Sequence, residues 1–142
     1  MASLVYNNGV NAALTGGVDF DTDSFKIMLV TSSYTPDKDQ HVDRADVTNE
    51  VTGTQYTSGG GSTTPTVSLD TTNDRVDITF SDVQFGTAQN GATITAAAGV
   101  LYKDTGNAAN DTLIAYLDFG GDVSSTSGIF TVSVTTPLRF SN

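Results

Sequence analysis

The chain of 142 residues contains no cysteine, no tryptophan, a single histidine and only six lysines and arginines. Without cysteine there is no disulfide framework, no thiolate nucleophile and no cysteine-ligated zinc site. A single histidine excludes a metal site built on a histidine pair within one chain. Six scattered basic residues do not form the clustered positive surface that binds a nucleic-acid backbone or an anionic membrane. We therefore expect neither nucleic acid nor a membrane as a partner.

Long apolar runs and a positively charged start are also missing. No stretch reaches the roughly 18 apolar residues that a membrane-spanning helix needs. Residues 1–6 lack the positive start and the apolar core of a signal peptide. The formal charge of −10 and the lack of cysteine fit an acidic protein that is made in a reducing cytoplasm.

Small β-branched and hydroxyl residues dominate the composition of the chain. With 23 threonines, 13 serines and 14 valines, the composition favours strands and excludes a helical bundle. Turn-forming residues predict loops, including one over 120–128. We therefore predict an all-β fold, a single-domain β-sandwich (jelly-roll-like) over residues 18–142. Its strands are predicted at 25–30, 50–52, 67–69, 76–80, 83–85, 93–102, 113–119 and 130–134, with an edge strand at 137–140.

Residues 1–17 follow a different pattern. Tyr6, Val10 and Leu14 recur at helical spacing, and a pair of glycines follows them as a typical helix end. This segment is predicted to be a short helix or an extended arm that lies outside the sandwich and contacts a partner. The residues predicted to form that interface are Leu4, Val5, Tyr6, Val10 and Leu14.

The alternating strands also predict which side chains are buried. Apolar residues on both faces of 25–30 indicate a central strand, and the even-numbered residues from 94 to 102 are expected to share one face. The predicted core residues are Phe25, Ile27, Leu29, Ile78, Phe80, Leu117, Phe119, Phe130 and Val132.

The acidic residues do not form the pattern of a tight metal site. The spacing of Asp19, Asp21 and Asp23 matches the first three ligands of a calcium loop. Such a loop also requires glycine and glutamate at positions that Ser24 and Val30 occupy here. We interpret the cluster as a solvated turn, while a weak calcium site among the aspartates at 104, 111, 118 and 122 stays open.

Catalytic patterns are equally absent from the sequence. His41 is the only histidine, and no G-x-S-x-G motif supplies a nucleophile for it, so an exposed loop residue is expected. Glu50 is the only glutamate, and no spacing singles out an aspartate partner for glycoside hydrolysis. We predict a chain that is not an enzyme and has no catalytic residue, metal or cofactor.

Four segments resemble structural proteins of tailed bacteriophages and prophages. They are FKIMLVTSSYTPD at 25–37, NEVTGTQYTSGG at 49–60, VLYKDTG at 100–106 and LIAYLDFG at 113–120. Among such virion proteins, the chain is most similar to capsid cement or decoration proteins. It departs from them in residues 59–66, where the family has an apolar residue closely behind the glycines.

The resemblance implies a jelly-roll-like protein that sits on the outside of the head as a trimer. Its partner would be the major capsid protein, whose shell it would stabilise without catalysis. It would then be located on the virion, after assembly in the cytoplasm of the bacterial host. A tail, head–tail connector or host-recognition module is an alternative place in the virion. A carbohydrate-binding β-sandwich is an alternative from another class, although the lack of tryptophan counts against it.

Overall fold

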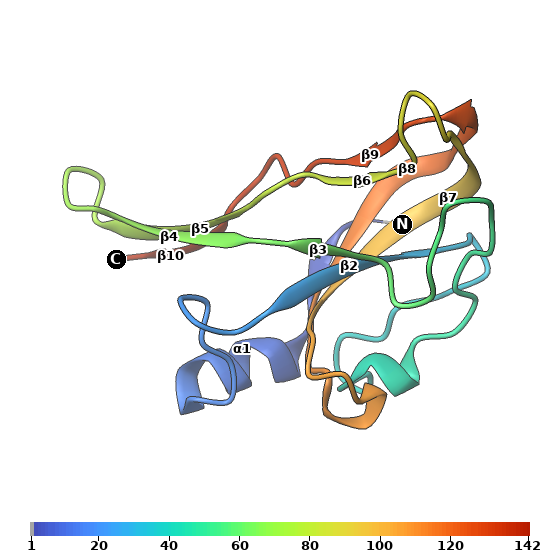
Figure 1. Cartoon of the computed structure of the whole chain (residues 1–142). Coiled ribbons are helices and arrows are strands. Elements are labelled where there is room, and N and C mark those ends of the chain that lie inside the picture. The colour runs from blue at the N-terminus through green and yellow to red at the C-terminus, as the bar shows by residue number, and fades with distance from the viewer. Residues whose placement is uncertain (1) are drawn as a thin grey trace.

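Ten antiparallel strands form the framework of residues 2–142, the part of the chain that the computed structural model describes (Figure 1). The strands are β1 (Leu4–Val5), β2 (Phe25–Val30), β3 (Gly61–Thr63), β4 (Pro65–Asp70), β5 (Arg75–Phe80), β6 (Val83–Phe85), β7 (Ala92–Lys103), β8 (Leu113–Gly128), β9 (Phe130–Val132) and β10 (Leu138–Ser141). The helical elements are α1 (Asn7–Thr15) and the 3₁₀ turns η1 (Arg44–Asp46) and η2 (Ala108–Asn110). The predicted all-β, sandwich-like fold with a short N-terminal helix is confirmed.

The strands are arranged in two layers. The first is a five-stranded sheet in the order β1-β8-β7-β2-β3, and the second consists of the three-stranded sheet β10-β5-β4 and the pair β6-β9. The chain passes from the first layer to the second at Thr64, between β3 and β4. In Figure 1 the hairpin of β4 and β5, with β10 beside it, extends beyond the five-stranded sheet. One face of this overhanging sheet therefore lies opposite α1 instead of another sheet.

The interior strand β2 of the five-stranded sheet, which lies between β7 and β3, carries apolar residues on both faces, and both are buried. Phe25 and Ile27 belong to one core cluster, which the second layer covers, and Met28 and Val30 belong to the other. Most of the predicted core is confirmed, with Leu117 and Phe119 only partly buried. The confirmed residues are Phe25, Ile27, Leu29, Ile78, Phe80, Phe130 and Val132.

A continuous strand replaces the loop that the sequence predicts over residues 120–128. The 16 residues of β8 pair with β7 from Leu113 to Gly128. Residues 119–122 bulge from the ladder, and Gly120 and Gly121 give the backbone its bend with φ values of 81° and 146°. The loop prediction is wrong because pairing with β7 outweighs the turn-forming composition of this segment.

The same bulge changes the alternation of side chains along β7. Ala96 pairs with Val123, but Ala98 pairs with Asp118. Ala96 then packs in the cluster of Phe25, whereas Ala98 packs in the other cluster. The even-numbered residues from 94 to 102 therefore do not share one face, contrary to the prediction.

The N-terminal segment is part of the first layer. Leu4 and Val5 pair with Tyr116 and Ala115 at the edge of the sheet. Tyr6 is fully buried in the cluster that covers the outer face of that sheet. The prediction of an arm outside the sandwich is wrong, because these apolar residues extend the sheet before the helix begins. Met1, the first residue of the predicted segment 1–17, lies outside the described residues.

The helix α1 lies directly against β8. A Cβ atom on Gly9 would be 2.4 Å from the carbonyl oxygen of Leu113, so only glycine permits this approach. The helix ends at Gly16, which has a φ of 87°, as the pair of glycines predicts. No helix among residues 2–142 is long and apolar enough to cross a membrane.

Candidate functional site

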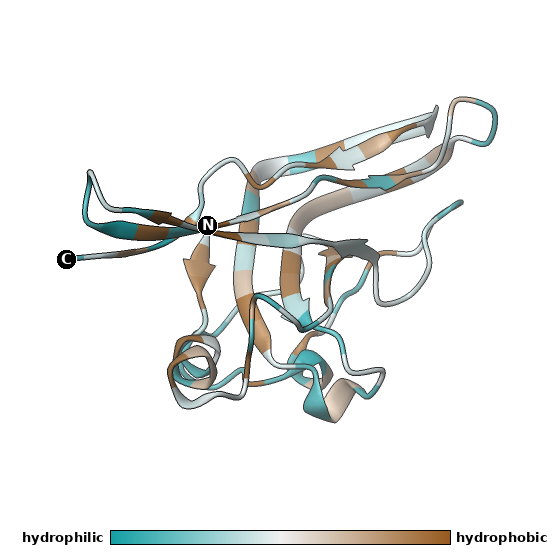
Figure 2. Ribbon diagram, turned by 60° about the vertical axis from the view of Figure 1, so that its left-hand side comes forward, coloured by the Kyte–Doolittle hydropathy of each residue, from teal (hydrophilic) through white to brown (hydrophobic). Residues whose placement is uncertain are grey.

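The three overhanging strands form a sheet with one apolar and one polar face. Their sequences alternate strictly, with PTVSLD in β4, RVDITF in β5 and LRFS in β10, as the colours in Figure 2 show. The antiparallel register aligns the three alternations, so apolar residues meet apolar residues across the sheet. The apolar rows are Leu69, Val76 and Phe140, followed by Val67, Ile78 and Leu138.

The charged side chains on the polar face of this sheet form ion pairs with one another. The Arg139 guanidinium donates two hydrogen bonds to the carboxylate of Asp77, with N–O distances of 2.7 and 3.0 Å. Arg75 Nε lies 3.2 Å from Asp70 and 3.5 Å from Asp77. The Arg139 guanidinium holds the pKa of Asp77 below its usual range. Both arginines are thus committed to the polar face.

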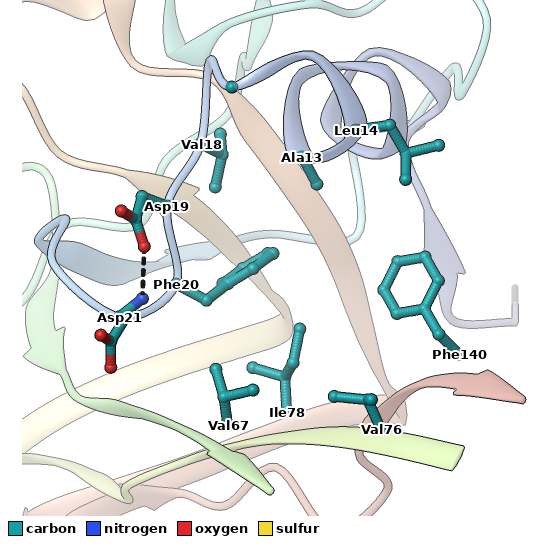
Figure 3. A pocket seen from close by; sticks show the side chains of 11 residues that line it. Ala13, Leu14, Val18, Asp19, Phe20, Asp21, Val67, Val76, Ile78 and Phe140 are labelled. Carbon is teal, nitrogen blue, oxygen red and sulfur yellow. Dashed lines mark hydrogen bonds between the residues drawn. The ribbon is translucent and has the colours of Figure 1, made fainter. Parts of the chain in front are cut away.

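The apolar face and the helix α1 form the two walls of a groove of about 800 Å³ (Figure 3). Ala13 and Leu14 come from the helix wall, and Val67 and Phe140 come from the sheet wall. Phe20 extends between the two walls in Figure 3. The groove adjoins a second hollow of about 370 Å³, which Ala13, Phe20 and Phe140 also line.

Phe20 fixes the inner end of the groove. Its ring stacks on Phe25 at a centroid distance of 5.3 Å and meets the edge of Phe80 at 6.1 Å. These aromatic contacts tie the segment between α1 and β2 to both layers of the sandwich. The helix wall therefore has a fixed position relative to the sheet wall.

The apolar side chains are more exposed toward the tip of the overhang. Along β4 the exposed fraction rises from 46% at Val67 to 72% at Leu69, whereas Ile78, beside Val67 in the middle strand of the sheet, is 4% exposed. On the facing wall, Leu14 is 71% exposed. Nothing within residues 2–142 covers these side chains. A cluster of exposed aliphatic residues on opposite walls of one groove is typical of a surface that binds a protein partner.

One end of the groove is acidic. Asp19 and Asp21 line it, and the backbone N–H of Asp21 donates a 2.8 Å hydrogen bond to Asp19 Oδ1 (Figure 3). This bond and those from Thr22 hold the pKa of Asp19 below its usual value, so the carboxylate is charged near neutral pH. Asp23 accepts a bond from the Asp19 N–H and pairs with Lys103 at 3.0 Å. Within residues 2–142, no group of three or more acidic or histidine side chains is placed to hold a metal ion.

The five residues predicted as an interface lie in different places. Leu14 lines the groove, and Val5 and Val10 line the adjoining hollow. Leu4 is half-buried in β1, and Tyr6 is fully buried, so Tyr6 offers no surface to a partner in this structure. Its inclusion in the predicted interface is corrected, because it completes the core of the chain itself.

Sequence reasoning missed the sheet wall of the groove. The alternation in β4, β5 and β10 is a signal that could have found an amphipathic sheet. The apolar face stays uncovered because this sheet extends beyond the five-stranded sheet. No local sequence pattern encodes that extension.

The single histidine and the single glutamate stabilise loops. The His41 ring stacks on Tyr34, whose hydroxyl lies 2.9 Å from His41 Nδ1, so the residue is not the free loop histidine that the sequence predicts. Glu50 accepts hydrogen bonds from the Tyr56 hydroxyl at 2.7 Å and from the backbone N–H of Gly59 at 2.6 Å. Each of the two residues thus closes one loop.

Asp111 and Arg44 form the most deeply buried ion pair. The Asp111 side chain has no exposed surface, and Arg44 Nε donates to its Oδ2 at 2.8 Å. Burial alone would raise the pKa of Asp111, but hydrogen bonds from Thr105 and the Arg44 guanidinium outweigh it and lower that pKa. The pair joins η1 to the segment before β8, and its role is structural.

No protein-family model, curated protein or solved structure matches the chain. A function has therefore to be inferred from the groove and from the sequence itself.

Proposed function

We propose that this chain is a structural protein of a tailed-bacteriophage virion, a cement or decoration protein that binds the outside of the head. It binds the major capsid protein as a trimer and stabilises the shell without catalysis. The observation that carries the proposal is the exposed apolar face of the overhanging sheet, with α1 opposite it. This surface suits a protein partner, and the four resembling segments indicate which kind of partner.

Such a protein would stabilise the shell through the thermodynamic linkage between its binding and the stability of the shell. A protein that binds the assembled shell, but not free subunits, lowers the free energy of the shell in proportion to the logarithm of its concentration relative to Kd. A standard protein interface buries about 800 Å² on each partner. The apolar groove would form the centre of such an interface, and the acidic residues around it would form the rim.

The test uses heads of the phage or prophage whose genome encodes the chain. Heads assembled without the protein should form normally but rupture at a lower temperature than complete heads. Adding the purified protein should restore the rupture temperature, and the protein should sediment with the heads.

The proposal fails if heads without the protein are as heat-resistant as complete heads and the purified protein does not sediment with them. Sedimentation with purified tails would then support the tail or host-recognition alternative. Saturable binding on a glycan array, without binding to heads or tails, would support the carbohydrate-binding alternative.

A further inference from the structure

The groove between α1 and the overhanging sheet is apolar along its length and negative at one end. Leu14 and Val67 are exposed on opposite walls, and Asp19 and Asp21 lie together at one end (Figure 3). The Asp21 carboxylate has no hydrogen-bond or ion-pair partner in the part of the chain that the structure describes. The surface therefore combines a run of apolar contacts with a local negative charge at a defined position.

Of the six basic residues, only Lys38 has no ion pair within residues 2–142. In residues 2–142, five basic side chains lie in ion pairs with aspartates of the same chain. These are Lys26 with Asp104, Arg44 with Asp111, Arg75 with Asp70, Lys103 with Asp23, and Arg139 with Asp77. Lys103 lies near the acidic end of the groove, where it pairs with Asp23, while the Asp21 carboxylate has no partner among residues 2–142. A positive group of another molecule can pair with Asp21 there.

We propose that the groove binds an apolar protein segment that carries a lysine or arginine at the end lying against Asp19 and Asp21. That this segment belongs to the shell subunit rests on the proposed function. That it is apolar with a basic end is inferred from the groove alone. Apolar side chains of the segment contact Leu14, Val67 and Phe140, and its basic residue pairs with the two carboxylates.

A second copy of the chain does not fit this description. Each copy has a formal charge of −10, so two copies repel each other at long range. Five of the six basic side chains of a second copy are already paired with its own aspartates, which leaves only Lys38 to pair with the acidic end. Charge complementarity therefore favours a different, basic partner.

A small molecule also does not fit. Small-molecule sites enclose most of their ligand and place a few polar groups around it. Here the lining is apolar on two long walls, the carboxylates lie at one end, and the groove continues into the hollow beside Val10 and Leu138. An elongated segment of chain uses both hollows at once.

The first experiment compares three synthetic peptides in binding to the 142-residue chain, followed by methyl NMR. One peptide has an apolar run with two lysines at one end, the second has the same run with two glutamates, and the third has the lysines with a serine run. The lysine-flanked apolar peptide should shift the methyl signals of Leu14, Val67 and Ile78. The glutamate peptide should bind roughly tenfold more weakly, because exposed charge pairs have effects of this size, and the difference should shrink in high salt.

Variants then separate the apolar contact from the charge. Val67→Asp should abolish binding, whereas Thr66→Asp, on the polar face of the same strand, should leave it unchanged. Asp21→Asn should reduce the preference for the lysine peptide by about threefold, which is the effect of one exposed ion pair. Asp122→Asn removes the same charge at the bulge of β8 and should leave the preference unchanged.

The proposal is overturned if the lysine-flanked apolar peptide causes no shifts in the groove, or if the lysine and glutamate peptides bind equally. It is also overturned if the chain is a dimer in solution that Val67→Asp dissociates, since the occupant is then a second copy. Binding of the variants to phage heads distinguishes failure of the groove proposal from failure of the proposed function. Heads that bind Val67→Asp as well as wild type refute the groove but leave the cement role intact. Peptide binding without head binding refutes the cement role and leaves the groove intact.

Discussion

Replacing Tyr6 tests whether the first residues of the chain belong to its core. The Tyr6 ring is fully buried, its backbone N–H donates to the Ile114 carbonyl at 3.0 Å, and its hydroxyl lies 3.0 Å from the Tyr34 hydroxyl. Tyr6→Ala removes a large buried ring, a change that costs about 3–5 kcal/mol in other cores. Tyr6→Phe keeps the ring and removes one hydrogen bond, which costs about 1 kcal/mol.

These costs are large relative to the stability of one domain. A chain of this size has a free energy of unfolding of about 5–15 kcal/mol, and 1 kcal/mol shifts Tm by about 3 °C. We expect Tyr6→Ala to lower Tm by roughly 10–15 °C and Tyr6→Phe by about 3 °C in calorimetry. Leu14→Ala is the matched control in the same segment, because its side chain is 71% exposed. It should change stability by no more than about 0.5 kcal/mol.

The reasoning is refuted if Tyr6→Ala is as mild as Leu14→Ala. That result would mean that the segment before β2 contributes nothing to folding, as an arm outside the sandwich would. Deleting residues 2–15 would then leave Tm unchanged, whereas the buried position of Tyr6 requires a lower Tm.

Three further predictions address the interior and the acidic loops. Asp111→Asn should lower the free energy of unfolding at pH 7 by about 2–3 kcal/mol, because it leaves the Arg44 guanidinium without its buried partner. Since the folded-state pKa of Asp111 is depressed, its contribution is present above the unfolded-state pKa of about 4 and is lost as pH falls through the lower folded-state value. Wild type should therefore lose this stabilisation in acid and the variant should not; equal acid sensitivity in pH-dependent denaturant titrations would count against the pair. Gly60→Ala should prevent folding, because its Cβ would lie 1.9 Å from the Ile27 carbonyl oxygen, whereas Gly106→Ala, with the same φ of 82° and open space around it, should cost only about 1–2 kcal/mol; comparable Tm values for the two would contradict this. EDTA should leave Tm unchanged, because Asp19 already accepts hydrogen bonds from its own loop; a large fall would reveal a metal site.

The sequence predicts the strands of this fold better than their partners. The alternating residues and the turn-forming segment 70–74 place β4 and β5 as a hairpin, and Pro137 identifies the last strand as an edge strand. The sequence also identifies β2 as a strand buried on both faces, since Phe25 and Met28 face different clusters, although the central strand of the sheet is β7. These features follow from local periodicity, which any buried strand must satisfy.

The errors arise where tertiary pairing outweighs local composition. The segment 120–128 is rich in residues that favour turns, yet β7 provides a partner strand along its length. Tyr6 lies on the predicted face of a helix, but the preceding Leu4 and Val5 join the sheet and carry Tyr6 into the core. Neither outcome is encoded within the segment itself.

The candidate site was predictable only on its helix side. Helical spacing identifies Val10 and Leu14 as apolar residues in need of a partner, and both remain exposed. The sheet wall, with Val67 and Phe140, depends on how far the second layer extends beyond the first. How far the second layer extends depends on the lengths of strands that lie in different parts of the sequence.

The pairing of β1 with β8 has a consequence for the synthesis of the chain on the ribosome. The strand partner of Leu4, Tyr116, is added roughly 100 residues after Leu4, which takes about 5–20 s at ordinary rates of translation. During this interval β1 has no strand to pair with, and Tyr6 has only the neighbours that come from the preceding half of its cluster, such as Met28 and Tyr34. The β2 strand similarly has no partner strand β7 until about 70 residues later, so the first sheet closes only after β8 has been made. Such non-local pairing makes folding slow, and it leaves the apolar strands β1 and β2 exposed to aggregation until β8 is complete.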